Sequence, residues 1–325
     1  MTKNNNRLNV FFFVLTLFSA TLVLLSFVNY PIIVSEILIS FRVAVSIAFL
    51  CFVVIFIMAR AYWLGMIQIL LVIVNIWPVV SVYSFNEAPS TCIYDEQQKP
   101  FKILSFNVYY KNKNYEHIYQ ALKTSAVDVI VLQEAQPGFM KYAHDRLVST
   151  YPFYYPAIEK GHHARWTIYS KYPVLDVHAR KVRGGRGAVL RVEIEVDGRI
   201  VNIITLHAIS PRTLNRVEAR NAHLDGLAAV VREIMKDNQH VIVAGDFNNV
   251  PWHPAMKAFK ARVGLRNNDV AFSYFGTWPT WLPSIFSTPI DHIFYDQSFH
   301  HVSYFRKPSA GSDHYPISAD LYFCE

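Results

Sequence analysis

The sequence predicts a chain in two parts, an α-helical membrane region followed by an α/β sandwich. Residues 1–90 contain three long uncharged apolar runs and only four basic and two acidic side chains. Runs of this length are typical of membrane-spanning helices. From Phe101 onward, short β-rich runs alternate with helical segments, and several of the runs are arranged as hairpins. That mixture favours an α/β sandwich over a doubly wound parallel sheet.

The composition agrees with this division. The chain has 325 residues, of which 52% are hydrophobic and 17% charged, which is more apolar than an average soluble protein. The formal net charge of +7 is compatible with a polyanionic partner or an anionic membrane surface. It is too small to establish either, and an ordinary solvated surface is the favoured explanation.

The three apolar runs predict transmembrane helices at about 10–28, 37–59 and 61–85. Lys3 and Arg7 precede the first run, and the positive-inside rule therefore places the amino terminus in the cytoplasm. Arg60 then lies inside between the second and third helices, and the chain after residue 86 lies outside. A cleaved signal peptide is the alternative for the first run, and a buried helical core is the alternative for all three.

Residues 87–100 are polar and predict a linker, and residues 101–325 form the predicted folded domain. Helical periodicity covers 115–124 and 216–236, and a hairpin covers 187–207. The other predicted strands are 101–108, 127–132, 167–170, 290–295, 317–323 and the run that ends at Gly245 within the stretch 241–248. Cys92 and Cys324 bracket the domain. They form a disulfide if the domain faces an oxidising compartment, and two unpaired thiols are the equal alternative.

Polar residues follow or end the predicted strands. They are Asn107, Glu134, His207, Asp246 with Asn248, Asp291, and Asp313 with His314. Carboxylates bind hard divalent cations, and a histidine oriented by an aspartate can act as a general acid. The set therefore suits phosphoryl transfer. The structural alternatives are turns made by the Asn and Asp side chains and, for His207, a hydrogen-bonded core histidine.

Seven short segments resemble the endonuclease/exonuclease/phosphatase superfamily, which includes deoxyribonuclease I and neutral sphingomyelinases. They are LSFNV at 104–108, VLQE at 131–134, YSKYPV at 169–174, TLHA at 205–208, GDFN at 245–248, IDHIF at 290–294 and SDHYPI at 312–317. Each segment is weakly specific alone, and their order along the chain makes the resemblance strong. The resemblance implies a four-layered α/β sandwich of two packed mixed β-sheets.

The resemblance also implies a bound metal. Glu134 would be the principal ligand of Mg²⁺, with Mn²⁺ or Ca²⁺ as alternative ions. Asn107 would help at the metal or the phosphate, and Asp313 would be a second carboxylate of the metal site.

Five further residues take catalytic roles by the same resemblance. Asp246 would orient or deprotonate the attacking water, and Asn248 would hold the phosphate. His314 would contact the scissile phosphate and be held by Asp291. His207 would lie on the leaving-group side.

The predicted function is a membrane-anchored, Mg²⁺-dependent phosphoesterase that cleaves phosphodiesters by attack of water, with nucleic acid favoured as its substrate. A phospholipid or sphingolipid phosphodiesterase or phosphatase is the alternative, supported by the membrane anchor and by the aromatic stretch 274–283. Prolines and turn residues predict that this stretch is a loop beside the site, and a packed core segment is the alternative for it. A catalytically silent binding module is a third possibility.

Tyr109 stands where the apurinic endonucleases have an aspartate, which argues against abasic-site repair. The layout resembles bacterial members, and so we expect a multi-pass inner-membrane protein whose catalytic domain faces the periplasm or exterior. No obligate protein partner is indicated.

Overall fold

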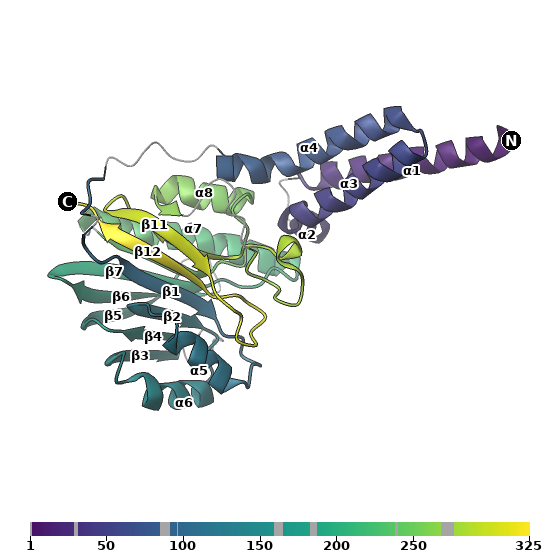
Figure 1. The fold of residues 1–325 in the computed structure, drawn as a ribbon. Helices are drawn as coiled ribbons and strands as arrows, with labels where there is room; N and C mark the ends of the chain where they lie inside the picture. Colours follow the sequence, from purple (N-terminus) through teal and green to yellow (C-terminus); the bar gives the residue numbers. More distant parts are fainter. Residues whose placement is uncertain are drawn as a thin grey trace.

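The computed structural model describes residues 2–28, 32–84, 92–95, 97–158, 165–182, 187–237, 240–267 and 276–325. Two parts are visible in Figure 1, a sandwich of sheets and helices and a bundle of helices that projects away from it. Part of the predicted linker at 87–100 lies outside the described residues, since 87–91 and 96 are not among them.

Two six-stranded sheets form the centre of the sandwich. The first has the strand order β11-β12-β1-β2-β4-β3 and the second β5-β6-β7-β8-β10-β9. In the first sheet the strands are β1 (Phe101–Asn107), β2 (Val129–Gln133), β3 (Phe153–Ile158), β4 (Arg165–Ser170), β11 (Phe299–Arg306) and β12 (Ile317–Phe323). In the second they are β5 (Val174–Lys181), β6 (Ala188–Val196), β7 (Arg199–His207), β8 (Val241–Asp246), β9 (Arg266–Asn267) and β10 (Asp291–Tyr295). Each sheet has one parallel pair near its centre, β1 with β2 and β7 with β8, and antiparallel neighbours elsewhere, so both sheets are mixed.

Helices cover the outer face of each sheet (Figure 1). Helices α5 (Tyr115–Lys123) and α6 (Pro137–Leu147) pack on the first sheet, and α7 (Leu214–Asp237) and α8 (Pro254–Val263) pack on the second. A third apolar core lies between the sheets and includes Ile103, Val131, Ile203, Ala244 and Ile293. Alternate residues of each strand fill the inner and outer cores, as the period of two along a strand requires. The predicted four-layered sandwich of two mixed sheets is therefore confirmed.

Glycine is required at one position of β8. Gly245 lies so close to β7 that a Cβ atom built on it would be 2.2 Å from the carbonyl oxygen of Leu206. The absence of a side chain lets the end of β8 approach β7 closely. This approach brings Asp246, the next residue, alongside His207, its register partner on β7.

The projecting helices occupy the three predicted apolar runs, but their geometry differs from three simple spans. They are α1 (Thr2–Leu25), α2 (Ile33–Ser40), α3 (Arg42–Met58) and α4 (Tyr62–Ser84). Among the described residues, only Tyr62–Tyr83 forms a single helix long and apolar enough to cross a membrane. Asn9–Leu25 is shorter, and the pair α2 and α3 would count as one further span although the two helices are bent by 79°. The multi-pass prediction with three spans is therefore not supported.

The bend between α2 and α3 has a physical cause in Arg42, which the prediction had placed inside the span at 37–59. Phe41 leaves the helical conformation at the bend, with φ −103° and ψ 27°. The Arg42 guanidinium is buried; it donates to the carbonyl oxygen of Asn75 at 3.0 Å and lies 4.5 Å from the centre of the Phe27 ring. An unpaired charge among apolar helices is costly. The bend between α2 and α3 allows the Arg42 guanidinium to reach partners inside the helical region.

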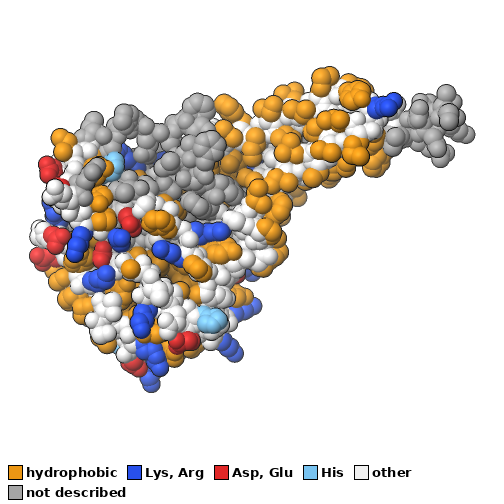
Figure 2. Space-filling view, in the orientation of Figure 1, with side chains coloured by type: hydrophobic (Ala, Val, Ile, Leu, Met, Phe, Trp, Pro, Cys, Tyr) orange, Lys and Arg blue, Asp and Glu red, His pale blue; other side chains and the backbone are white. Residues whose placement is uncertain are grey.

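Apolar side chains cover the outside of the projecting helices. Figure 2 shows them as a nearly continuous hydrophobic surface, whereas charged side chains are scattered over the sandwich. Met58 is 80% exposed and Leu24 is 71% exposed, and Phe18, Trp63 and Met66 are more than half exposed. A contiguous apolar surface of this kind is a site of membrane or protein contact rather than ordinary protein surface.

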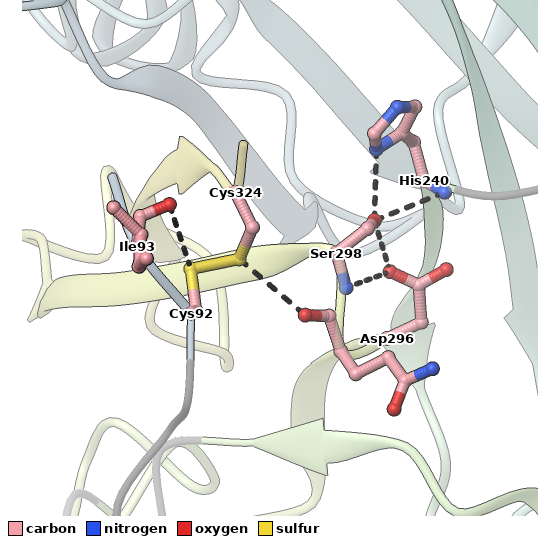
Figure 3. The surroundings of a disulfide bond; sticks show 7 residues. Cys92, Ile93, His240, Asp296, Ser298 and Cys324 are labelled. Carbon is pink, nitrogen blue, oxygen red and sulfur yellow. Dashed lines mark hydrogen bonds between the residues drawn. A yellow bond between two sulfur atoms is a disulfide. The ribbon is translucent and has the colours of Figure 1, made fainter. Parts of the chain in front are cut away.

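Cys92 and Cys324 form a disulfide, with their Cα atoms 5.2 Å apart. Figure 3 shows the bond beside the Asp296–Ser298–His240 hydrogen-bond network at the end of the sandwich. It ties the segment that enters the domain to the carboxyl terminus and so closes a loop with a sequence separation of 232. The sequence left open whether Cys92 and Cys324 form a disulfide or remain unpaired thiols, and the structure contains the disulfide.

Removing this disulfide is expected to destabilise the sandwich. The double variant Cys92→Ser and Cys324→Ser should lose about 2–5 kcal/mol of unfolding free energy, because the bridge restricts a long loop of the unfolded chain. Denaturant unfolding of the purified chain in detergent measures this. The control is Cys51→Ser, since Cys51 is a free cysteine exposed on α3. Equal midpoints for the double variant and the control would contradict the expectation.

Candidate active site

The register of the second sheet places three candidate side chains in a row. Asp246, the last residue of β8, pairs with His207 at the end of β7 and with Asp291 at the start of β10. Laterally paired residues project to the same face of a sheet. Ala244 and Ile293, two residues away on their strands, belong to the core between the sheets. His207, Asp246 and Asp291 therefore project inward, where the space between the sheets ends.

The first sheet contributes from the opposite side. Asn107 ends β1 on the same inner face as Ile103 of the central core, and Glu134 follows β2 directly. The Asn107 amide nitrogen donates to Glu134 Oε1 and to Asp246 Oδ2, both at 3.1 Å. The bond to Glu134 joins two strand ends of the first sheet, and the bond to Asp246 joins the first sheet to the second, so these residues form a single site.

Asp246 is the centre of the site. Its Oδ2 atom accepts from the Asn248 amide at 3.2 Å and lies 3.5 Å from His207 Nε2 and 3.8 Å from His314 Nε2. His207 Nε2 is also 3.4 Å from Glu134 Oε1. Only 1% of Asp246 is exposed. Burial and the Asp291 carboxylate raise the Asp246 pKa to about 6, against the opposing effect of His314 and His207. A carboxylate with such a pKa can accept a proton near neutral pH.

His314 and Asp291 form a buried pair. His314 Nδ1 donates to Asp291 Oδ2 at 2.8 Å. Burial alone would lower the His314 pKa, but Asp291 and Asp246 outweigh it and raise the pKa to about 10. The imidazole is therefore a cation in the folded protein, and its Nε2 atom is directed toward Asp246. The backbone N–H of Asp291 donates to Thr277 Oγ1 at 3.2 Å, which fixes the start of β10.

Three residues of the site segments have a left-handed backbone. The φ angles are 61° at Tyr109, 59° at Glu134 and 48° at Asn248. Residues other than glycine rarely adopt this conformation, and such strain concentrates at functional sites. The Tyr110 N–H donates to Glu134 Oε2 at 2.9 Å, and the Asn248 amide also donates to the Ala208 carbonyl at 2.8 Å. These bonds compensate the strained turns and fix the direction of the two side chains.

Asp313 is the predicted residue that lies apart from this network. It is half-buried beside His314, and the Trp278 indole donates to its Oδ2 at 3.3 Å. Burial raises the Asp313 pKa. Residues 276–283 of the predicted loop lack helix or strand structure, and Trp281 is 74% exposed; residues 274–275 lie outside the described part of the chain. Trp278 itself was not singled out by the sequence as a neighbour of Asp313, because no motif contains it.

His292 has a different role from Asp291, its neighbour. It is buried on the outer face of β10, and its Nε2 atom lies 2.9 Å from the Asn249 carbonyl oxygen. Burial lowers its pKa to about 4, and so it is neutral. Adjacent residues of a strand face opposite sides, and so His292 points away from the site into which Asp291 projects.

The site has the donors that a divalent cation requires. Asp246, Asp291 and His314 offer ligand atoms that all lie within 4.8 Å of one another. In the described part of the chain, Asp291 Oδ1 and Asp313 Oδ1 are buried and have no hydrogen-bond partner. Buried carboxylate oxygens without a donor fit a bound cation, because burying an uncompensated charge is costly. A protonated histidine cannot ligate a metal, which favours the carboxylates over His314.

Comparison with known proteins identifies the chain. Residues 104–314 match the model of the Endonuclease/Exonuclease/phosphatase family. Among solved structures, the human nocturnin catalytic domain is 16% identical with a TM-score of 0.56, covering 71% of this chain and 97% of that one. Truncated Caenorhabditis elegans TDP2 is 19% identical with a TM-score of 0.55, covering 69% and 97%. Sphingomyelinase C from Streptomyces griseocarneus is 16% identical with a TM-score of 0.53, covering 69% and 99%.

No match was found among curated protein sequences. The structural likenesses have low identities and show the fold, while the family match covers most of the chain and every site segment from Leu104 to His314. The prediction of a phosphoester hydrolase is therefore confirmed, and the chain belongs to the endonuclease/exonuclease/phosphatase family of metal-dependent phosphoester hydrolases.

Proposed function

We propose that this protein is a membrane-anchored, Mg²⁺-dependent phosphodiesterase. The observation that carries the proposal is the convergence of Asn107, Asn248, His207 and His314 on one buried carboxylate, Asp246. A proton acceptor surrounded by amides and imidazoles suits attack of water on a phosphate ester.

Each side chain has a role in this scheme. Asp246 orients the attacking water and accepts its proton, since its pKa is raised to about 6. Asn248 holds a phosphoryl oxygen through its amide. His314, kept protonated by Asp291, binds the scissile phosphate, and His207 lies on the leaving-group side.

Glu134, with Asn107 and Asp313, would hold the cation. Glu134 contributes a carboxylate beside Asp246, Asn107 joins the two, and Asp313 contributes a buried oxygen that has no hydrogen-bond partner in the described chain. When bound, Mg²⁺ neutralises charge on the phosphoryl oxygens. The His207 Nε2 atom lies 3.4 Å from Glu134 Oε1 and 3.5 Å from Asp246 Oδ2, within reach of both carboxylates.

We propose that residues 1–86 are the membrane region, 87–100 the linker and 101–325 the catalytic domain. The exposed apolar surface of the projecting helices supports insertion in a bilayer. The Cys92–Cys324 disulfide supports a location of the catalytic domain in an oxidising compartment such as the bacterial periplasm.

Nucleic acid is the first substrate class, supported by the net charge of +7 and by His207 in the site. A lipid headgroup is the second candidate, and a specific observation favours it. Trp278 donates to Asp313 and also packs with Phe41 of the helical region, with ring centres 6.5 Å apart. One residue thus contacts both the site and the region that would lie at the membrane.

A substrate comparison tests the proposal. The full chain, extracted with detergent from the membrane fraction, is assayed with Mg²⁺ on plasmid DNA and on liposomes that contain sphingomyelin and phosphatidylcholine. Hydrolysis of DNA alone supports the first substrate class, and release of phosphorylated headgroups supports the second. Inactivity on both, or recovery of the chain in the soluble fraction without detergent, would contradict the proposal.

A further inference from the structure

A buried ion pair joins the helical region to the sandwich behind the active site. Glu36 of α2 accepts from Arg220 of α7 at 2.9 Å, and its other oxygen lies 3.2 Å from His253 Nε2. The Arg220 side chain is 1% exposed and that of Glu36 is 9% exposed. Desolvating two charges is costly unless their geometry is good. A helical region that only tethered the sandwich would not need a buried ion pair with it.

Arg220 extends this contact to the catalytic loop. Its guanidinium donates to the carbonyl oxygen of Asn248 at 3.3 Å. Asn248 is held in a left-handed conformation with φ 48°, and its side chain donates to Asp246 at 3.2 Å. A continuous chain of bonds therefore runs from Glu36 through Arg220 and Asn248 to the central carboxylate.

A second set of contacts joins the same parts. The Trp252 indole donates to the carbonyl oxygen of Ile39 in α2 at 2.7 Å. Ile39 and Val79 of the helical region share an apolar cluster with Val250, Trp252 and Ile290 of the sandwich. Val250 and Trp252 belong to the loop that follows Asp246, and Ile290 immediately precedes Asp291. The helical region thus packs on both segments that carry the catalytic aspartates.

We propose that Arg220 is a positioning residue for the catalytic loop and that Glu36 holds it in place, so that the helical region completes the active site in addition to anchoring it. The inference rests on the proposed phosphodiesterase function. Without the Glu36 carboxylate, Arg220 is a buried cation that has lost its anionic partner. It then shifts or recruits water, and the Asn248 backbone loses its fixed orientation. The effect falls on turnover, because Arg220 and Glu36 bond the loop from behind and not through the atoms assigned to the substrate.

The test uses Glu36→Gln in the full chain in detergent, with hydrolysis of bis(4-nitrophenyl) phosphate in Mg²⁺ as the assay. We expect kcat to fall by about 10-fold, comparable to the loss of one buried charged hydrogen bond, with KM within about 2-fold of the wild type. Asp225→Asn is the matched control, since Asp225 lies on α7 like Arg220 and forms an exposed ion pair with Arg262 of α8. It should retain wild-type kinetics.

Two further measurements separate positioning from general destabilisation. If Glu36 acts through Arg220, the Glu36→Gln/Arg220→Gln double variant should lose no more kcat than Arg220→Gln alone. Amide hydrogen exchange should increase across residues 246–253 in Glu36→Gln but not across 101–107 of β1. If Glu36→Gln does not fold, Trp252→Phe removes the bond to Ile39 and should show the same loss of kcat and the same exchange pattern.

The outcomes distinguish a failure of the proposed phosphodiesterase function from a failure of the proposed positioning role. A wild-type chain that leaves the phosphodiester probe intact contradicts the proposed function, and the exchange measurement then still tests the positioning. An active wild type whose Glu36→Gln and Trp252→Phe variants retain both kcat and exchange protection at 246–253 would overturn the inference while leaving the function standing.

Discussion

Replacing Asp246 with asparagine is expected to lower kcat by about 10²–10⁴-fold, the range for loss of a general base. Asparagine preserves the shape of the side chain but cannot accept a proton from water. In the folded chain the Asp246 carboxylate is buried and accepts hydrogen bonds from Asn107 and Asn248. An amide in its place would present an N–H group to one of these donors and would weaken the site further.

The measurement is the turnover of bis(4-nitrophenyl) phosphate by the purified variant in Mg²⁺. Asp176→Asn is a suitable control, because Asp176 pairs with His178 on the edge strand β5 and is 43% exposed. The control should match the wild type. A turnover of Asp246→Asn within about 3-fold of wild type would mean that the proton acceptor lies elsewhere, because a lost general base costs at least about 10²-fold.

Replacing His314 with alanine is the second large effect that we expect, a loss of about 10²–10⁴-fold in kcat. The imidazolium is the cation whose Nε2 lies 3.8 Å from Asp246, and the buried Asp291 keeps it protonated. Alanine removes the charge that would bind the scissile phosphate. It also leaves the Asp291 carboxylate without its hydrogen-bond donor at Oδ2.

Asp291→Asn separates these two consequences. It retains His314 but removes the anion beside Nδ1, and it should lose less kcat than His314→Ala. His292→Gln is the control on the opposite face of β10, where the side chain contacts the Asn249 carbonyl; a change there should alter stability more than turnover. Full turnover in His314→Ala would show that this histidine does not contact the reacting phosphate.

The sequence predicted the centre of the sandwich well, because its inner strands are short apolar runs with polar residues at their ends. Val241 to Asp246 is buried throughout in the structure. The structure brings the ends of β7, β8 and β10 into one register and the end of β1 opposite them, and register in a sheet follows from the alternation of apolar residues. The sequence could not predict how closely residues of the first sheet approach residues of the second, as Asn107 approaches Asp246.

Other elements had no clear sequence signal. Strand β5 lies at a sheet edge and alternates little between buried and exposed residues, so it was not predicted. Helix α8 follows the catalytic loop directly and begins at Pro254, with His253 as its N-cap. The contact of Glu36 with Arg220 joins residues far apart in the chain, and one sequence contains no pattern that pairs them. The bend at Phe41 likewise depends on the partners of Arg42 rather than on local composition.

The central claim is that the converging strand ends form a metal-dependent phosphodiesterase site. The most direct test strips the full chain of metal with EDTA and titrates MgCl₂ while the hydrolysis of bis(4-nitrophenyl) phosphate is followed, for the wild type and for Glu134→Gln. We predict no turnover in EDTA, saturable recovery for the wild type, and a much higher Mg²⁺ requirement for Glu134→Gln. Equal rates with and without EDTA, or no turnover at any Mg²⁺ concentration, would contradict the account.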